Sequence, residues 1–186
     1  ASQVKKNEAL HKVNHVSICP SGDCFVFVHR YLIKGRRHDR LMLLNIDGTG
    51  LEELSNFGMV SHYCWINKSE LIGFLRGPDG QDGYWKVDVV NKKFTRCDVC
   101  QGLGDGHPSS HKNLIVTDSY PNKSRMQNLV IFDINNLKQK NLGSFFHSFK
   151  FTNESRCDLH PRFGKTGNYV YFDSVFDGNR RLYRMS

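Results

Sequence analysis

The sequence predicts an all-β fold, and three observations support this prediction. Short runs of β-branched and aromatic residues recur along the chain, among them CFVFVHR, RLMLLNI, ELIGFL, NLVIFDI and YVYFDS. Turn-forming stretches separate these runs, among them PSGD, DGTG, GPDGQDG and GKTG. Helical periodicity is confined to the first dozen positions (VKKNEALHKV) and is weak even there. Apolar runs joined by such turns are typical of antiparallel strands.

The chain repeats four times, and each repeat opens with a histidine. The openings are HVSI at His15, HYCW at His62, HPSS at His107 and HPRF at His160, at steps of 47, 45 and 53 residues. After each opening come a turn, an apolar strand, a polar loop, a second apolar strand and a weaker strand. Four strands per unit at this period are typical of a β-propeller blade. We therefore predict a β-propeller with four-stranded antiparallel blades.

The predicted blades occupy residues 15–57, 61–101, 106–150 and 159–186 of a single propeller domain or propeller fragment that spans residues 1–186. The fourth blade ends after its third strand, so we expect its outer strand to come from the N-terminal segment or from residues outside this chain. Propellers typically carry about four to eight blades. We favour part of a larger propeller over a small ring, because of the missing strand and the Ala start. An open blade edge would then pair with another chain.

The composition excludes several classes of protein. Lys and Arg number 26 against 18 Asp and Glu, a net charge of +8, and 39% of the 186 residues are hydrophobic, which is typical of a folded globular chain. No apolar run reaches the roughly 18 to 20 residues that span a bilayer, and the first residues lack the apolar centre of a secretory signal. We expect no membrane span and a cytoplasmic location, with a removed signal as the alternative.

Neither the cysteines nor the common catalytic motifs indicate a particular activity. Cys97 and Cys100 form the only close pair among six cysteines, and a zinc ribbon would need a second such pair or paired histidines. We therefore favour buried reduced thiols. The sequence also lacks the GxSxG, P-loop, GxGxxG and HExxH motifs.

Propeller topology gathers the candidate functional residues on one face. The inner strand of a blade lines the channel and later strands run antiparallel outward, so strand-one starts, strand-two ends and the loops that follow share this face. Besides the four histidines, it collects Arg30, Arg76, Asp118, Asp173, Lys34, Arg36, Arg37, His38, Lys123, Arg125, Arg180 and Arg181. A basic rim favours carboxylate or phosphate ligands. The absence of a recognisable nucleic-acid motif disfavours nucleic acid.

Two interpretations of the histidines stay open. Each ring could bond the backbone of the next blade as a structural signature of the repeat. Alternatively, radial repetition could bring three neutral imidazoles around one axis, where they would hold a divalent ion with an open position for substrate.

Several segments resemble the TolB-like propeller repeat, and more narrowly they are similar to the oligogalacturonate lyase-like propellers, including relatives found beside bacterial polysaccharide genes. They are HVSICPSG from His15, NIDGT from Asn45, SHYCW from Ser61, DGHP from Asp105 and LHPR from Leu159. The resemblance covers residues 14–185, although the members of that family are longer, seven-bladed chains. It implies a divalent ion, usually manganese, held near the axis by histidines and a glutamine, and cleavage of short uronate chains by β-elimination.

When individual residues are matched to the motifs of that family, the resemblance implies a specific metal site. His62 matches the Ser-His-x-x-Trp position, His160 matches the His-Pro start of the last blade, and His107 matches a third strand-start histidine. Where the lyases have a glutamine and a further histidine, this chain has Arg156, Cys157 and Asp158. Gln127 is the other nearby glutamine and belongs to a different blade. The implied metal ligands are His62, His107 and His160, joined by Asp158.

The leading hypothesis is recognition or β-elimination of an acidic oligosaccharide on a metal-containing rim. Arg125, Arg156 and Arg162 are the candidate carboxylate contacts, and His15 is the candidate base. The alternative is a non-catalytic propeller that binds a protein or glycan partner. A third hypothesis is an enzyme-appended propeller. Metal content separates the first two, because an interaction platform needs no bound ion.

Overall fold

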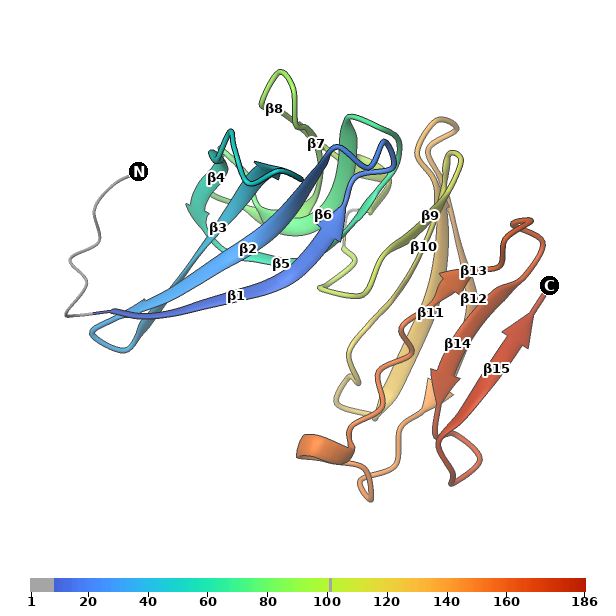
Figure 1. Cartoon of the computed structure of the whole chain (residues 1–186). Helices are drawn as coiled ribbons and strands as arrows, with labels where there is room; N and C mark the ends of the chain where they lie inside the picture. The colour runs from blue at the N-terminus through green and yellow to red at the C-terminus, as the bar shows by residue number, and fades with distance from the viewer. Residues whose placement is uncertain (1–8, 101) are drawn as a thin grey trace.

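The chain folds almost entirely into antiparallel sheet, as the computed structural model of residues 9–100 and 102–186 shows (Figure 1). In its described part, the stretch with weak helical periodicity belongs to β1, which begins at Ala9 and pairs with β2; residues 1–8 lie outside the described residues. The helical segments in the described part are two short 3-10 turns, η1 (Asp98–Cys100) and η2 (Asn153–Ser155). Within that part, no helix has the length and apolarity needed to cross a membrane.

The strands form four sheets in sequence order. The first sheet contains β1 (Ala9–Ile18), β2 (Cys24–Ile33), β3 (Arg36–Asn45) and β4 (Glu52–Gly58). The second contains β5 (Val60–Trp65), β6 (Glu70–Arg76), β7 (Asp82–Asp88) and β8 (Lys93–Arg96). The third contains β9 (Ser109–His111), β10 (Leu114–Asp118), β11 (Met126–Asp133) and β12 (Lys138–Phe146). The fourth contains β13 (Arg162–Phe163), β14 (Val170–Ser174) and β15 (Arg181–Met185).

This architecture is a β-propeller with four blades, the last of which has three strands, and it confirms the predicted fold class. Figure 1 shows the blades following one another along an arc, with the first and last blades apart. The expected donation of an outer strand to the fourth blade is wrong for the described N-terminal residues, because Ala9 to Asn14 pair with β2 instead.

Apolar side chains fill the spaces between successive blades. One buried cluster contains Val28 of the first sheet and Leu75 of the second, and another contains Ile72 of the second and Ile115 of the third. A third cluster joins the third and fourth sheets and includes Leu129. Burying one such side chain contributes about 1.5–3 kcal/mol. This packing fixes the inner strands side by side.

The first blade is longer than the others. Its strands β1, β2 and β3 each have 10 residues, whereas the inner strands β9 and β13 have 3 and 2. The extra length forms an arm (Figure 1). On the arm, His29 stacks on His11 at a ring-centroid distance of 5.1 Å, and Tyr31 stacks on His38 at 5.4 Å. Residues 36–38, which were expected in a loop, belong to strand β3.

Candidate functional site: a row of four histidines

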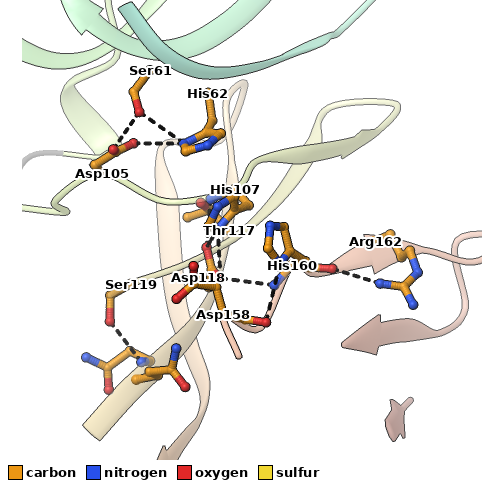
Figure 2. A network of polar contacts seen from close by, with 12 residues as sticks. Ser61, His62, Asp105, His107, Thr117, Asp118, Ser119, Asp158, His160 and Arg162 are labelled. Atoms are coloured by element: carbon orange, nitrogen blue, oxygen red, sulfur yellow. Dashed lines mark hydrogen bonds and ion pairs between the residues drawn. The ribbon is translucent and has the colours of Figure 1, made fainter. Parts of the chain in front are cut away.

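Four histidine rings form a continuous row along the inner strands, one from each blade. The ring centroids are 4.7 Å apart for His15 and His62, 4.2 Å for His62 and His107, and 3.8 Å for His107 and His160. Figure 2 shows the last three rings following one another across the blades. Radial repetition therefore brings together side chains that lie about a blade apart in the sequence.

Register shifts in β1 and β5 set the orientation of the rings of His15 and His62. β1 pairs Asn14 with Val28 and then Ser17 with Val26, so a bulge contains His15. A similar register shift in β5, between Val60 and Tyr63, contains His62. A bulge bends its strand and can re-aim a side chain. The expectation that every histidine opens its inner strand is thus wrong for the first two blades.

The last two rings lie before their strands. His107 precedes β9 and His160 precedes β13. The φ angles of His15 and His160 are 50° and 41°, in the left-handed region that non-glycine residues rarely occupy. Such conformations cost about 1–3 kcal/mol and cluster at functional sites.

A protein oxygen atom lies near the Nδ1 atom of three of the rings. Nδ1 of His62 is 3.4 Å from Asp105 Oδ1, and Nδ1 of His107 is 2.9 Å from Asp118 Oδ1. Nδ1 of His160 is 3.3 Å from the carbonyl oxygen of Asp158. A ring that donates its proton from Nδ1 keeps the lone pair of Nε2 for a metal ion or a substrate proton.

Asp118 joins the third and fourth blades. Its carboxylate is almost fully buried, and it accepts hydrogen bonds from the backbone N–H of His107 at 2.6 Å and of His160 at 3.0 Å. Gly106 makes the close approach possible, because a Cβ there would lie 2.0 Å from the Asp118 carbonyl oxygen. One carboxylate therefore sets the positions of two neighbouring histidines.

Asp105 has the corresponding role between the second and third blades. Ser61 Oγ donates a 2.6 Å hydrogen bond to Asp105 Oδ2 and lies 3.0 Å from His62 Nδ1 (Figure 2). Burial acts to raise the pKa of Asp105, but the hydrogen bonds from His62 and Ser61 outweigh it and hold this pKa below its ordinary value. The sequence placed Asp118 on the rim and Asp105 beside a histidine, without predicting that either holds an imidazole.

The two ends of the row favour neutral imidazoles. Partial burial lowers the pKa of His15, and the neighbouring His62 and Arg30 lower it further. Partial burial also lowers the pKa of His160, with a further contribution from His107. Both rings therefore stay unprotonated near neutral pH, which is the form that accepts a proton or binds a metal ion.

Asp158 lies at the edge of the row and has one oxygen without a partner. Arg156 Nη2 donates a 2.8 Å hydrogen bond to Asp158 Oδ2, whereas Oδ1 is buried and has no hydrogen-bond partner in the described part of the chain. The Arg156 guanidinium lies over the Tyr120 ring at 4.9 Å, and that ring is 5.7 Å from the ring of His107. Burial raises the pKa of Tyr120 to about 12. Tyr120 thus connects Arg156 and Asp158 to the row.

The other two predicted arginines differ in their relation to the row. Arg162 Nη1 donates a 3.0 Å hydrogen bond to the His160 carbonyl oxygen (Figure 2). Arg125 instead donates to the carbonyl oxygen of His147 at 2.9 Å and lies over the ring of Phe149 at 4.8 Å. The structure therefore brings Arg156 and Arg162 to the row and places Arg125 against another segment.

Gln127, the other glutamine considered, lies in the protein interior. It is fully buried, and its Nε2 donates a 3.2 Å hydrogen bond to the carbonyl oxygen of Cys157. Its Oε1 has no partner among the described residues. The glutamine of the third blade thus contacts the segment that enters the fourth.

The donors of the row suit a divalent ion. Three rings have Nδ1 near an oxygen, and Asp158 Oδ1 is buried without a partner among the described residues. Carboxylates or carbonyls commonly hold the second nitrogen of metal-binding histidines in this way. The rings form a row, however, and no three of their ligand atoms lie within 4.8 Å of one another in the described residues.

A hollow opens beside the first three rings. Its volume is about 250 Å³, and its lining includes His15, His62, Tyr63 and His107. It places His15 and the middle of the row on one accessible surface.

Several solved structures are similar to this chain. No protein-family model matches the sequence, and none of the curated proteins matches it. The chain is similar to an oligogalacturonate lyase in complex with manganese, with 20% identity and a TM-score of 0.71 over 93% of this chain and 48% of that one. It is also similar to an oligogalacturonate lyase from Vibrio parahaemolyticus, with 16% identity and a TM-score of 0.68 over 92% of this chain and 48% of that one.

TolB from Acinetobacter baumannii is a further structural neighbour, with 10% identity and a TM-score of 0.64 over 95% of this chain and 41% of that one. The chain thus spans about half the length or less of these three proteins. At such identities the likeness establishes a β-propeller fold and does not assign an activity.

Proposed function

We propose that the histidine row binds a divalent metal ion, with manganese as the expected ion, and that the rim binds acidic oligosaccharides and cleaves them by β-elimination. The observation that carries this proposal is the set of oxygen atoms near Nδ1 of His62, His107 and His160. These contacts use Nδ1 of each ring and leave Nε2 without a hydrogen-bond partner among the described residues, so three adjacent rings each offer one nitrogen to an ion. The likeness to a manganese-containing lyase supports the choice of ion.

The proposed ligands are His62, His107 and His160, with the unpartnered Oδ1 of Asp158 as an oxygen donor. Imidazole and carboxylate donors without thiolate suit a range of divalent ions, and the choice of manganese rests on the likeness to the lyase in complex with manganese. The ion would neutralise the carboxylate of a uronate and so acidify the C5–H bond beside it.

Arginines supply the remaining recognition of carboxylates. Arg162 is bonded to the His160 carbonyl and Arg156 lies over Tyr120, so both guanidinium groups lie at the edge of the row. A guanidinium can bind a carboxylate through two parallel hydrogen bonds. Arg125 lies against His147, and we assign it to a more distant carboxylate of a longer substrate.

His15 is the proposed base. Its ring borders the hollow, and its lowered pKa keeps it unprotonated near neutral pH. The Nε2 lone pair would take the C5 proton, the C5–H electrons would form the C4–C5 double bond, and the C4–O4 bond would break. The leaving oxygen would take a proton from water, so the products are an unsaturated uronate and a shortened chain.

The test of this function uses short oligogalacturonates as the probe. We expect metal-free protein supplied with manganese to form unsaturated product, measured by its ultraviolet absorbance, and we expect a chelator or His62→Ala to abolish it. Saccharide binding without any product would contradict β-elimination and would favour the non-catalytic platform. Absence of both binding and product would overturn the proposed function.

A further inference from the structure

A second group of ligating side chains lies on the turn between β1 and β2. Cys19, Asp23 and Cys24 form the group of three His, Cys, Asp or Glu residues in the described chain whose ligand atoms all lie within 4.8 Å of one another. Cys19 Sγ is 2.9 Å from Asp23 Oδ1 and 3.0 Å from Ser21 Oγ. Cys19 is buried, Cys24 is half-buried and Asp23 is exposed, so the group has a buried side and an accessible side.

The fourth blade contains the same turn without these side chains. In the first blade the N–H of Cys19 donates to the Cys24 carbonyl at 2.9 Å. In the fourth blade the N–H of Gly164 donates to the Tyr169 carbonyl at 2.8 Å. A second bond, from Gly22 to Cys19 and from Gly167 to Gly164, is 2.9 Å in both.

The positions of Cys19, Asp23 and Cys24 are therefore occupied in the fourth blade by Gly164, Asn168 and Tyr169. The turn of the fourth blade therefore forms the same backbone hydrogen bonds without any of the three ligating side chains. Formation of the turn thus does not explain the two thiols and the carboxylate.

The surroundings of the turn suit a cation. A hollow of about 930 Å³ adjoins it and is lined by Asp23 and Cys24 together with Asp47, Glu52 and Lys68. Lys92 forms a 2.8 Å ion pair with Glu52, so the three carboxylates exceed the two lysines by one charge. Nearby negative charge raises the local concentration of cations.

We propose that Cys19, Cys24 and Asp23 form a zinc site that is separate from the histidine row. Zinc accepts thiolate and carboxylate ligands in a tetrahedral arrangement, and soft thiolates select it over manganese. Three protein ligands leave one position of the ion, which water would occupy on the side of the hollow. Binding would release the protons of both thiols as the two sulfur–zinc bonds form.

Cobalt(II) is the probe that tests this site, with the full chain kept reduced. Thiolate coordination of cobalt gives charge-transfer absorption in the near ultraviolet, and imidazole coordination at the histidine row does not. We expect one equivalent of cobalt to give this absorption and zinc to abolish it by displacement. The double variant Cys19→Ser with Cys24→Ser should lose the absorption.

Two further variants keep the test decisive if the double variant folds poorly. Asp23→Asn changes an exposed side chain and should weaken cobalt binding by roughly tenfold or more, since loss of even an outer-sphere partner has about that effect. The matched control is Cys97→Ser with Cys100→Ser, which removes a buried thiol pair whose sulfur atoms are 2.9 Å apart. This control should retain the full absorption.

Three results would overturn the proposal. Wild-type protein could show no charge-transfer absorption, the absorption could survive loss of both Cys19 and Cys24, or it could vanish in the Cys97 and Cys100 control. The last result would place the thiolate site at the other cysteine pair. His62→Ala should leave the cobalt absorption unchanged, so failure of the zinc site and failure of the histidine site are distinguishable.

Discussion

The histidine row and the cysteine turn gather their donors in different ways. The row takes one imidazole from each of four blades, and carboxylates such as Asp118 join successive blades behind it. The turn takes its donors from residues 19–24 of one blade. The row therefore depends on how the blades pack, whereas the turn depends on one hairpin. Substitutions in one region therefore test whether the other depends on it.

The largest expected effect is on chemistry at the row. His15→Ala should lower the rate of unsaturated-product formation by about 10²–10⁴-fold, the usual contribution of a general base. Manganese binding should persist, because His15 is not among the proposed ligands. The control is His11→Ala, which removes a histidine from the arm. Equal rates for His15→Ala and wild type would remove His15 from the mechanism.

The second largest expected effect is on manganese affinity, after substitution of Asp118, whose carboxylate contacts His107 and His160. Asp118→Asn removes the charge facing His107 Nδ1 and should weaken manganese binding by roughly 10–100-fold, measured by calorimetry. Asp173→Asn changes the residue at the corresponding strand end of the fourth blade and should leave manganese affinity close to wild type. Cobalt absorption at the cysteine turn should be the same in both variants. A matching loss in Asp173→Asn would contradict the specific role of Asp118.

A steric change tests how far the row depends on blade packing. Gly106→Ala would place a Cβ against the Asp118 carbonyl and should lower the free energy of unfolding by about 1–3 kcal/mol, together with manganese affinity. Gly104→Ala is the matched control, because a Cβ there meets no atom within 4 Å. Denaturant unfolding of both variants measures the difference. Identical unfolding curves for Gly106→Ala and wild type would contradict the packing argument.

The smallest expected effect is the pH dependence of stability in metal-free protein. The folded-state pKa values of His15 and His160 lie below the ordinary value of 6.5, so the unfolded chain binds more protons as the pH falls through that value. The contribution of the two rings to stability is therefore present above pH 6.5 and is lost as the pH falls through the folded pKa. Unfolding midpoints of wild type and His15→Ala, measured from neutral pH to about pH 5, should differ in slope. Parallel curves would contradict the lowered pKa of His15.

Much of this molecule follows from the repeat in its sequence. The apolar runs and the four histidines at near-blade spacing predict the propeller, and radial repetition predicts that the histidines meet. The bulges at His15 and His62 are not visible in the sequence, because they depend on register with the neighbouring strand. The pairing of Asp105 with His62 was also missed, since it depends on the path of the loop into the third blade.

Two other features depend on tertiary context. The segment around Leu10 has weak helical periodicity, yet it forms a strand because β2 is long enough to pair with it. Cys19 and Cys24 fall outside the CxxC spacing that is typical of zinc sites, so their spacing alone does not predict one. Only the closed hairpin brings the two thiols and Asp23 within reach of one ion.

The most direct test of the central claim is manganese binding to metal-free protein, followed by the electron paramagnetic resonance signal of free manganese. We predict that wild type takes up one ion per chain, that His62→Ala and His160→Ala lose this uptake, and that the Cys19→Ser, Cys24→Ser variant retains it. Failure of wild type to bind manganese, or unchanged binding in both histidine variants, would contradict a metal site at the histidine row.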